Sequence, residues 1–492
     1  MAATSSSRQT RFPTNVSARA AAAEAAGAGR KQGRILQEGS SSPPAQREKT
    51  DLKPVKGTRD FPPRDLRQRA WLFSHFRAVS SLFGFEEWDA PVLEAEALYT
   101  RKAGEEISEQ LYNFEDRGGR RVALRPELTP SLARVALKQG KALALPAKWS
   151  AVGQCWRYER MTRGRRREHY QWNLDVLGAP GEAAEAELLA AVVALFQRLG
   201  LTSVDVGLKV SHRGVLAEVA TRAGVPSERF GAACVIIDKA DKMPREDVRR
   251  LLCEALEVGE GVGEGDSAAG DVEAQADALL AVLDTGKDAA SVRALLGTDS
   301  EAAGSLERLF GLADAYGISD WLVLDTGVVR GLAYYTGFVF EGFDRRGELR
   351  AVCGGGRYDG LMETYGSPVR VPACGFGFGD AVIIELLIER GLLPDFERDA
   401  GDGEGLVDDV VAALDDSTQA EAARAAAQLR AQGRRVDLVL EPKKMQWVFK
   451  QCERQGAGRL ITVGKREAEA GTVAVRDLAT RETVEVPARH LA

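Results

Sequence analysis

Polar and apolar residues alternate without a break from His169 to Val176, at the period of a β-strand whose successive side chains point to opposite faces. The polar positions are His169, Gln171, Asn173 and Asp175, and the apolar positions are Tyr170, Trp172, Leu174 and Val176. We expect the apolar face to anchor this strand in a core and the polar face to line a charged floor. A sheet face that is polar only because it meets water is the alternative interpretation.

The segment before this strand completes an antiparallel hairpin. Arg157 and Glu159 share one face, and Trp156 and Tyr158 lie on the opposite one. The connecting loop, Arg160–Arg167, carries five arginines. Guanidinium groups bind phosphate oxygens in a bidentate fashion, so we expect a phosphate-binding site with a mobile cationic tip.

Helical spacing of apolar residues runs from Arg67 to Gly84, where a glycine is typical of a helix end. Phe85–Trp88 then leads into a strand that ends at Pro91. An amphipathic helix lying on a sheet accounts for this order.

From about residue 204 to 316 the pattern is mainly helical. SHRGVLAEVATRAG and DKADKMPREDVRRLLCEALEVG predict helices, and helical spacing returns from Asp271 to Leu296. Gly259–Gly270 is acidic and glycine-rich, as linkers are. The basic residues of this region could touch RNA or form a solvated helix face, which we favour; they are Lys239, Lys242, Arg245, Arg249 and Arg250.

After about Leu406, strands and helices alternate. We expect strands at Asp409–Leu414, Val436–Leu440 and Arg459–Val463, helices at Thr418–Gln432 and Pro442–Gln455, and a hairpin of Thr472–Arg476 and Glu482–Val486. This order predicts a small sheet with right-handed crossovers.

The first fifty residues differ in composition from the rest of the chain. Positions 1–37 hold six arginines and lysines and one acid, Glu24, while alanine and serine dominate. A basic, serine-rich and acid-poor segment without a continuous apolar stretch is typical of an organellar transit peptide. We therefore expect residues 1–50 to direct the protein to a chloroplast or mitochondrion; a disordered tail of a cytoplasmic protein is the alternative.

The overall composition excludes several classes of protein. The net charge is −6, so any contact with nucleic acid must come from local basic patches. The six cysteines form no C-x-x-C pair and there are four histidines, so we expect no zinc site. The sequence contains no P-loop, and it contains no apolar run long enough to cross a membrane. We also expect no organic cofactor.

Several motifs together resemble the histidyl-tRNA synthetase family of class II aminoacyl-tRNA synthetases, in its plant and algal organellar form. Arg157–Asp175 resembles motif 2 of the class. The other matching segments are KGTRDFPP at Lys56–Pro63, LRPELT at Leu124–Thr129, DTGVVRGLAYYTGFVFE at Asp325–Glu341, and GGGRYDGL at Gly354–Leu361. The Arg-Gly-Leu-x-Tyr-Tyr element is specific to histidine enzymes, whereas motif 2 alone would indicate only the class.

The resemblance implies an α+β catalytic core with an antiparallel sheet flanked by helices, a helical insertion and a C-terminal α/β anticodon-binding domain. The expected ranges are 1–50 for the transit peptide, 51–203 and 317–395 for the core, 204–316 for the insertion and 405–492 for the anticodon-binding domain. It also implies a homodimer, formed through motif 1 in the helix and strand of residues 67–91. Lys443, Lys444 and Trp447 could contact unpaired bases of tRNA or be plain helix surface.

The activity implied by the resemblance is ATP-dependent activation of L-histidine to histidyl-adenylate, with Mg²⁺ on ATP, and transfer of histidine to the 3′ end of tRNA(His). Arg157 and Arg330 are the implied catalytic residues, which grip the α-phosphate. The implied histidine contacts are Glu127, Leu128, Thr129, Gln171, Asp175, Tyr334 and Tyr335. The implied ATP contacts are Arg157, Glu159, Arg165, Arg330 and Gly377, and those of the tRNA acceptor end are Arg160 and Arg167.

Three positions depart from the family pattern. Asp380 follows the glycines of Gly375–Gly379 without the usual motif 3 arginine, Ala333 stands where an aspartate is common, and Asp175 stands where most relatives have glutamate. We expect one of the loop arginines Arg163, Arg165 and Arg166, with Arg165 favoured, to replace the missing cation at the triphosphate tail of ATP.

Two alternative functions remain open. One is a non-catalytic regulatory subunit or a sensor of uncharged tRNA. We favour an enzyme over this alternative, because the chain retains Arg157, Arg330, Glu127 and the last domain. The other is a different class II synthetase, for proline or threonine, which the Arg-Gly-Leu-x-Tyr-Tyr element opposes.

Overall fold

The computed structural model describes residues 51–101, 109–240, 243–257, 266–285, 287–328, 334–397 and 405–491. In this part of the chain an eight-stranded sheet has the order β1-β5-β6-β11-β10-β9-β7-β8. Its strands are β1 Glu86–Glu87, β5 Ala147–Trp156, β6 Glu168–Leu177, β7 Val206–His212, β8 Leu322–Leu324, β9 Phe338–Asp344, β10 Cys353–Arg357 and β11 Ala373–Gly379. All neighbouring strands are antiparallel except the β1–β5 and β7–β8 pairs at the two edges.

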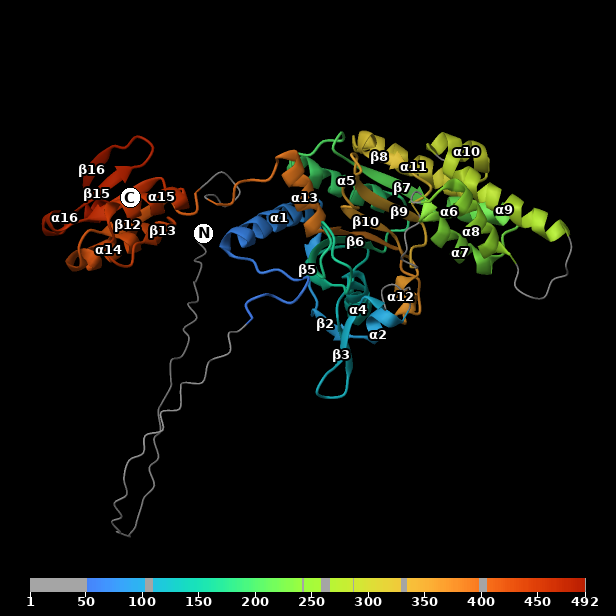
Figure 1. Cartoon of the computed structure of the whole chain (residues 1–492), viewed down its shortest axis with the longest axis horizontal. Coiled ribbons are helices and arrows are strands. Elements are labelled where there is room, and N and C mark those ends of the chain that lie inside the picture. The colour runs from blue at the N-terminus through green and yellow to red at the C-terminus, as the bar shows by residue number, and fades with distance from the viewer. Residues whose placement is uncertain are drawn as a thin grey trace, which may run out of the picture. The chain divides into compact units, whose positions relative to one another are not determined.

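The predicted hairpin is formed by β5 and β6, and its alternation is confirmed. Trp172 of β6 is fully buried and stacks on Phe76 of helix α1, Pro63–Leu82, with ring centroids 5.0 Å apart. Helices α5, Ala183–Arg198, and α13, Asp380–Arg390, pack with α1 over the same face of the sheet (Figure 1). The apolar residues of β6 therefore point into the main core, and the polar residues point to the opposite face.

Proline fits the first turn of α1 because its missing N–H would have no helical partner there. The helix ends before Gly84, whose φ of 71° is the left-handed conformation that glycine favours. The strand expected after it is short, since β1 comprises only two residues, which pair with Trp149 and Ser150 of β5.

Below the large sheet a second sheet of three strands has the order β2-β4-β3 (Figure 1). Its strands are β2 Leu93–Ala95, β3 Tyr112–Glu115 and β4 Arg121–Leu124. Three helices accompany it in the described chain: α2 Ala97–Thr100, α4 Thr129–Gln139 and α12 Leu361–Thr364. The turn from β4 into α4 carries the LRPELT segment toward the polar face of the large sheet.

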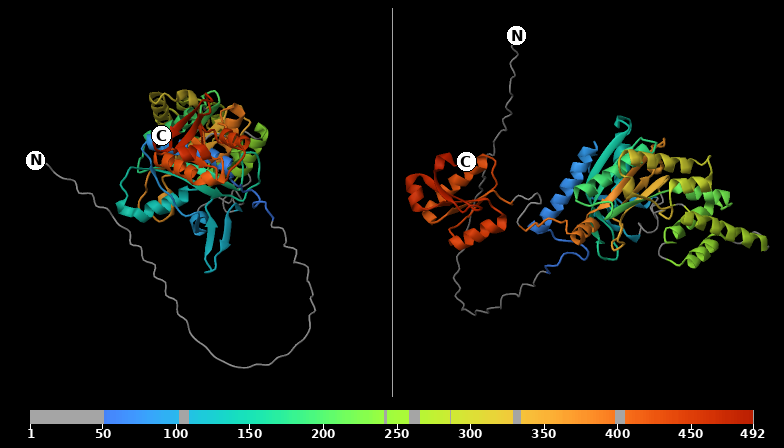
Figure 2. Two further views of the ribbon diagram at one scale, coloured as in Figure 1. Left: turned by 90° about the vertical axis from the view of Figure 1, so that its left-hand side faces the viewer. Right: turned by 90° about the horizontal axis from the view of Figure 1, so that it is seen from above.

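The insertion is helical, as expected, and its helices gather beside β7 and β8 (Figure 2). They are α6 Arg213–Arg222, α7 Ser227–Ile237, α8 Arg245–Leu256, α9 Asp266–Thr285, α10 Ala289–Leu296 and α11 Glu301–Ala315. The boundary predicted at residue 204 needs correction, because β7 pairs with β8 and β9 as part of the large sheet. The helices therefore begin at Arg213, and α7 is a helix that the sequence pattern did not predict.

The basic residues of α8 face acids of the same helix pair. Arg249 is bonded to Glu273 and Asp277 of α9, and Arg245 to Asp284. Arg250 pairs within α8 with Asp247 and Glu254. For these three arginines the contacts agree with the interpretation as a solvated helix face, whereas Lys242 lies outside the described residues.

The C-terminal domain contains a five-stranded sheet of order β13-β12-β14-β15-β16 in the described chain. Its elements are β12 Asp409–Ala413, α14 Gln419–Ala431, β13 Val436–Leu438, α15 Met445–Gln455, β14 Arg459–Val463, α16 Lys465–Ala470, β15 Thr472–Asp477 and β16 Thr483–Pro487. β12, β13 and β14 are parallel, and β15 and β16 form the expected hairpin. Helix α16 was not predicted from the sequence.

The predicted fold class is confirmed by these three parts. Residues 1–50, for which we predict a transit peptide, lie outside the described residues. In the described ranges, no helix combines the length and the apolar character that crossing a membrane requires.

Candidate active site

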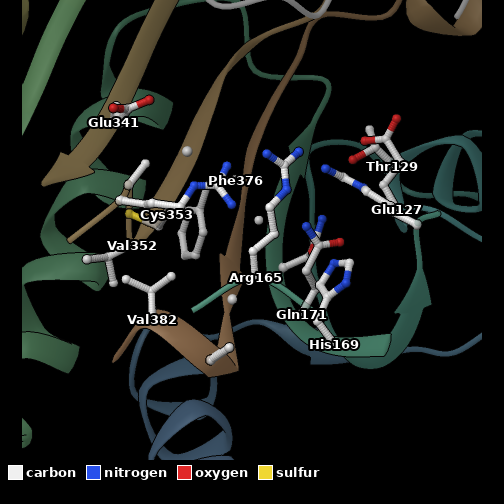
Figure 3. Close-up of a pocket in the computed structure, with 18 of the residues that line it drawn as sticks. Glu127, Thr129, Arg165, His169, Gln171, Glu341, Val352, Cys353, Phe376 and Val382 are labelled. Carbon is white, nitrogen blue, oxygen red and sulfur yellow. The ribbon is translucent and has the colours of Figure 1, made fainter. Parts of the chain in front are cut away.

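A cavity of about 440 Å³ lies on the polar face of the large sheet. Its walls come from β6, β10, β11, the turn before α4 and the loop between β5 and β6. Arg165 projects between its two ends (Figure 3). One end is mainly apolar, with Val352, Cys353, Phe376 and Val382; the other holds the polar side chains of Glu127 and Thr129 (Figure 3).

The floor of the cavity is the polar face of β6, as its alternation predicts. His169, Gln171 and Asn173 line the cavity, and Asp175 lies buried further along the same face. The neighbouring strand β11 places a glycine opposite three of these residues: Gly375 pairs with Asp175, Gly377 with Asn173 and Gly379 with Gln171.

Those glycines leave room for the polar side chains of β6. A Cβ at Gly375 would overlap Oδ1 of Asp175, and one at Gly377 would lie 2.9 Å from the side-chain nitrogen Nε2 of Gln171. The structure therefore explains the alternating glycines of GFGFG, because a side chain at either position would displace the floor of the site.

Arg157, the implied motif 2 arginine, lines this cavity at the end of β5. Its Nε donates a hydrogen bond to the carbonyl oxygen of Pro126, 2.9 Å away. Its Nη1 lies 3.9 Å from Oε1 of Glu159. One edge of the guanidinium is thus fixed by the backbone while the side chain borders the open space of the cavity.

The loop after Arg157 contacts neighbouring elements through two of its arginines. Arg165 forms an ion pair with Glu159 inside the cavity. Arg163 turns outward and pairs with Glu385 and Glu389 of α13, at 3.0 and 2.6 Å. Gly164 packs so closely on Val382 that a Cβ there would lie 3.2 Å from its side chain. Five arginines in sequence suggested a free arm, but Arg165 pairs with Glu159 of the same hairpin, and carboxylates distant in the chain supply the partners of Arg163.

Glu127, Thr129 and Tyr334 meet at the polar end of the cavity. The hydroxyl of Tyr334 donates a hydrogen bond to Oε2 of Glu127, at 3.1 Å. Burial raises the pKa of Glu127, and the nearby charge of Arg157 opposes that rise. Tyr335 lies beside Tyr334, with ring centroids 5.0 Å apart. A buried carboxylate, a hydroxyl and two phenol rings form a pocket suited to an ammonium group and an aromatic ring.

Asp175 is nearly inaccessible to solvent and receives a hydrogen bond from the hydroxyl of Tyr358. Burial raises its pKa to about 7, against the lowering effect of that hydrogen bond. Tyr358 follows β10 within the GGGRYDGL segment, and its ring is 5.9 Å from that of Tyr334. Sequence reasoning recognised this segment but did not assign Tyr358 to the site.

His169 is a further cavity residue that the sequence placed on the polar face without giving it a role. Burial lowers its pKa to about 3, and the charges of Arg157, Arg59 and Arg165 add to this effect. The imidazole is therefore neutral at physiological pH and adds no positive charge to the arginines around it.

Four predicted site residues do not line this cavity in the described part of the chain: one predicted for histidine, two predicted for the tRNA acceptor end, and Arg330. The side chain of Leu128 does not line the cavity: it is fully buried with Ala151 and Cys155, because Glu127 and Thr129 on either side take the cavity-facing directions. Arg160 is exposed and outside the cavity, and Arg167 stacks on the ring of Tyr158 at 3.7 Å. Arg330 lies outside the described residues.

Additional cavity residues come from elements that the sequence gave no reason to combine. Asp238 follows the insertion helix α7, Glu341 lies on β9, and Arg350 precedes β10. Charged side chains from the insertion and from two segments of the core therefore border the same space.

Comparison with known families agrees with the site. A family model described as Histidyl-tRNA synthetase matches residues 57–380, and one described as Anticodon binding domain matches residues 408–492. A relative from Arabidopsis thaliana named "Histidine–tRNA ligase, chloroplastic/mitochondrial" is 54% identical over 438 residues, which are 89% of this chain and 85% of that protein.

Among solved structures, the histidyl-tRNA synthetase of Nostoc sp. PCC 7120 has a TM-score of 0.71 at 22% identity, covering 90% of this chain and 99% of its own. An ATP phosphoribosyltransferase regulatory subunit/histidyl-tRNA synthetase from Bacillus halodurans C has a TM-score of 0.65 at 21% identity, covering 84% and 98%. These structures show the shared fold, and the fold alone does not separate enzymes from regulatory subunits. The family model over the core and the 54% identical relative, however, settle the family, and the chain belongs to the histidyl-tRNA synthetases.

Proposed function

We propose that this chain is a histidine–tRNA ligase, which joins L-histidine to AMP at the expense of ATP and then transfers it to the 3′ end of tRNA(His). The single observation that carries the proposal is the cavity itself. It combines an ammonium-type end, Glu127 and Thr129, with a phosphate-type wall, Arg157 and Arg165. A regulatory subunit or sensor would have no need for both ends in one cavity.

Adenylate formation needs an in-line attack by the carboxylate of histidine on the α-phosphorus of ATP, with pyrophosphate leaving. Positioning and cationic stabilisation of the phosphoryl oxygens suffice, so no protein nucleophile is required. We assign this stabilisation to Arg157 and Arg330. Glu159, Arg165 and Gly377 are the other ATP contacts that we propose, and the apolar end of the cavity suits the adenine base.

Histidine is assigned to the opposite end. Its ammonium group would bind Glu127 and Thr129, with Gln171 nearby, and its imidazole would lie against Asp175, Tyr334 and Tyr335. A site whose buried polar groups bond both ring nitrogens discriminates strongly against analogues that lack them, since those groups would otherwise go unpaired.

Mg²⁺ would accompany ATP and neutralise charge on the leaving pyrophosphate. Mg²⁺ is usually held by one or two carboxylates together with substrate phosphates, and Glu159 and Glu341 are carboxylates of the cavity wall that would be available to hold it. The acidic group Asp344, Glu348 and Glu389 lies outside the cavity and already holds Arg390 by ion pairs.

Three further assignments rest on the family. Arg160 and Arg167, on the outer side of the motif 2 loop, are proposed contacts of the tRNA acceptor end. Lys443, Lys444 and Trp447 in the C-terminal domain are proposed contacts of the anticodon, and Trp447 is 43% exposed. Motif 1, in α1 and β1, is proposed to form a homodimer.

We also propose that residues 1–50 direct the protein to a chloroplast or mitochondrion, as the name of the Arabidopsis relative says of that protein. A fusion of these residues to a fluorescent reporter should enter one of these organelles. Diffuse cytoplasmic fluorescence would contradict the assignment and favour a cytoplasmic enzyme.

ATP–pyrophosphate exchange across the amino acids tests the proposed function. Protein from residue 51 onward should support exchange with L-histidine alone. Exchange with proline or threonine instead would refute the assignment, and tight binding of uncharged tRNA without exchange would favour the sensor. Arg330→Ala should lower the activation rate by about a hundred- to a thousand-fold, the scale of one lost transition-state donor. Its affinity for histidine should change far less.

A further inference from the structure

Arg59, in the KGTRDFPP segment, lies between two buried carboxylates. Its Nη2 is 3.0 Å from Oδ2 of Asp380, and its Nε is 3.3 Å from Oε2 of Glu168. The side chains of both acids are at most 5% exposed, and that of Arg59 is 20% exposed. One arginine therefore serves as the shared cation of two acids that are separated from it by more than one hundred residues.

The two acids begin two of the elements that border the cavity. Glu168 is the first residue of β6, the strand that forms the floor, and Asp380 is the first residue of α13. Oδ1 of Asp380 also accepts a hydrogen bond from the backbone N–H of Tyr170, at 2.9 Å. Asp380 thus joins α13 to β6 directly and, through Arg59, a second time.

The backbone before Arg59 adds to this connection. The carbonyl oxygen of Gly57 accepts hydrogen bonds from the N–H groups of Arg167 and Glu168, at 3.1 and 3.3 Å. Gly57 has φ of 91°, and a Cβ there would lie 2.7 Å from the side chain of Arg167. Residues 57–59 are consequently packed on the end of the motif 2 loop, where it enters β6.

Arg59 does not border the cavity that we assign to ATP. It lines an adjacent cavity of about 310 Å³, and Gly164, Arg166 and Ala381 border both spaces. The loop tip is therefore a wall between the two cavities, with Arg59 behind it and Arg165 in front of it. Because Arg59 is already bonded to two carboxylates, it is poorly suited to replace the missing motif 3 arginine as a phosphate ligand.

We propose that Arg59 is a positioning residue for ATP, which acts by holding the motif 2 loop and β6 against the start of α13. Without this cation, Glu168 and Asp380 would be two buried acids beside the triphosphate site, and they would repel each other and the substrate. The chain thereby uses its motif 3 position as an anchor for the loop that carries Arg165. The inference rests on the assignment of the cavity to ATP.

Arg59→Met tests the inference in ATP–pyrophosphate exchange. We expect the KM for ATP to rise by roughly ten- to a hundred-fold, the range of one lost charge-assisted contact, with the KM for histidine changed less than threefold. Adding Asp380→Asn should restore much of the ATP affinity, because it removes one unpaired charge and its amide oxygen can still accept the hydrogen bond from Tyr170. Arg59→Lys should fall between wild type and Arg59→Met.

Arg67→Met is the matched control. Arg67 is also a partly buried arginine of this region, but it bonds the carbonyl oxygen of Phe396, away from the cavity. Its loss should lower thermal stability without changing the KM for ATP. If Arg59→Met lowers the melting temperature but leaves the KM for ATP unchanged, Arg59 is only structural and the inference is overturned.

Arg157→Ala separates this result from a failure of the site assignment. If Arg157→Ala leaves ATP dependence unchanged, the cavity does not hold the triphosphate, and the proposed site falls together with the inference. If Arg157→Ala impairs exchange and Arg59→Met does not, only the positioning role falls. If Arg59→Met does not fold, Arg59→Lys provides the test: its KM for ATP should rise while its KM for histidine stays nearly unchanged.

Discussion

The hydroxyl of Tyr358 bonds Oδ1 of Asp175, and the second oxygen of that carboxylate, Oδ2, is buried without a hydrogen-bond partner in the described residues. A buried acceptor without a partner is costly, so such groups are usually completed by a ligand or a water. Asp175 lies on the same face as the cavity residues Gln171 and Asn173. The orphaned oxygen is therefore a suitable acceptor for an N–H of the substrate imidazole, with Tyr358 fixing the carboxylate.

Replacing Tyr358 with Phe should weaken histidine binding. The change removes a charge-assisted hydrogen bond, worth about 1.5–3 kcal/mol, and frees the carboxylate to turn, so the KM for histidine should rise roughly ten- to a hundred-fold. The KM for ATP should change little. Tyr365→Phe is the control, because that hydroxyl bonds the carbonyl oxygen of Leu98 outside the cavity. Equal effects of the two changes would contradict a role of Tyr358 in recognition.

Asp175 should make histidine binding depend on pH near neutrality. Its pKa of about 7 means that the carboxylate is mostly ionised at pH 8 and mostly protonated at pH 6. If the ionised form accepts the imidazole N–H, its population falls about tenfold over this interval, and the KM for histidine should rise by a similar factor. In Asp175→Asn, the KM for histidine should depend on pH only through the titration of the substrate itself. If wild type and Asp175→Asn give parallel pH profiles of this KM, Asp175 is not the group that causes the pH dependence.

The same group affects stability, with the opposite dependence on pH. The pKa of Asp175 in the folded protein lies above the ordinary value of about 3.9. Its contribution to the free energy of unfolding is therefore fully present below that value and is lost as pH rises through 7. Thermal melts should therefore show wild type losing stability relative to Asp175→Asn between about pH 4 and pH 8. No change in this difference would show that Asp175 titrates normally in the folded protein.

Local pattern was sufficient to predict the floor of the site. The alternation from His169 to Val176 correctly separated cavity residues from core residues, because the side-chain direction in a strand is fixed by its period of two. The alternating helices and strands after Leu406 likewise gave most of the C-terminal elements, since each is bounded by its own turn residues.

Pairings between distant segments could not be predicted in the same way. Tyr358 and Asp175 are 183 residues apart, and Arg59 and Asp380 are 321 residues apart. No sequence period relates such residues, and only the order of strands in the sheet brings them together. The ion pairs of Arg163 were missed for this reason, because its partners lie on α13, more than two hundred residues later.

Gly375→Ala should damage the site from the neighbouring strand. The new methyl group would overlap Oδ1 of Asp175 and lie 2.7 Å from the backbone oxygen of Leu174. Overpacking of this kind costs about 1–3 kcal/mol, and it would displace the carboxylate from Tyr358. We expect exchange with histidine to fall at least about tenfold. Gly311→Ala on α11, where a Cβ meets open space, should leave exchange and melting temperature nearly unchanged; full activity of Gly375→Ala would mean that β6 adapts.

Arg165→Ala tests how the chain compensates for the missing motif 3 arginine. Arg165 lies inside the cavity, paired with Glu159, and we expect it to exchange this partner for the γ-phosphate when ATP binds. Its loss should raise the KM for ATP roughly ten- to a hundred-fold, with little effect on the KM for histidine. Arg163→Ala is the matched control, since Arg163 is held by Glu385 and Glu389 on the outside of α13.

Arg166 borders the cavity as well, and Arg166→Ala measures its share. If single alanine changes at Arg163, Arg165 and Arg166 all leave ATP dependence intact and weaken only tRNA charging, the loop serves tRNA alone. The γ-phosphate would then be neutralised by Mg²⁺ and solvent, and the pair of Arg165 and Glu159 would be a structural contact of the loop.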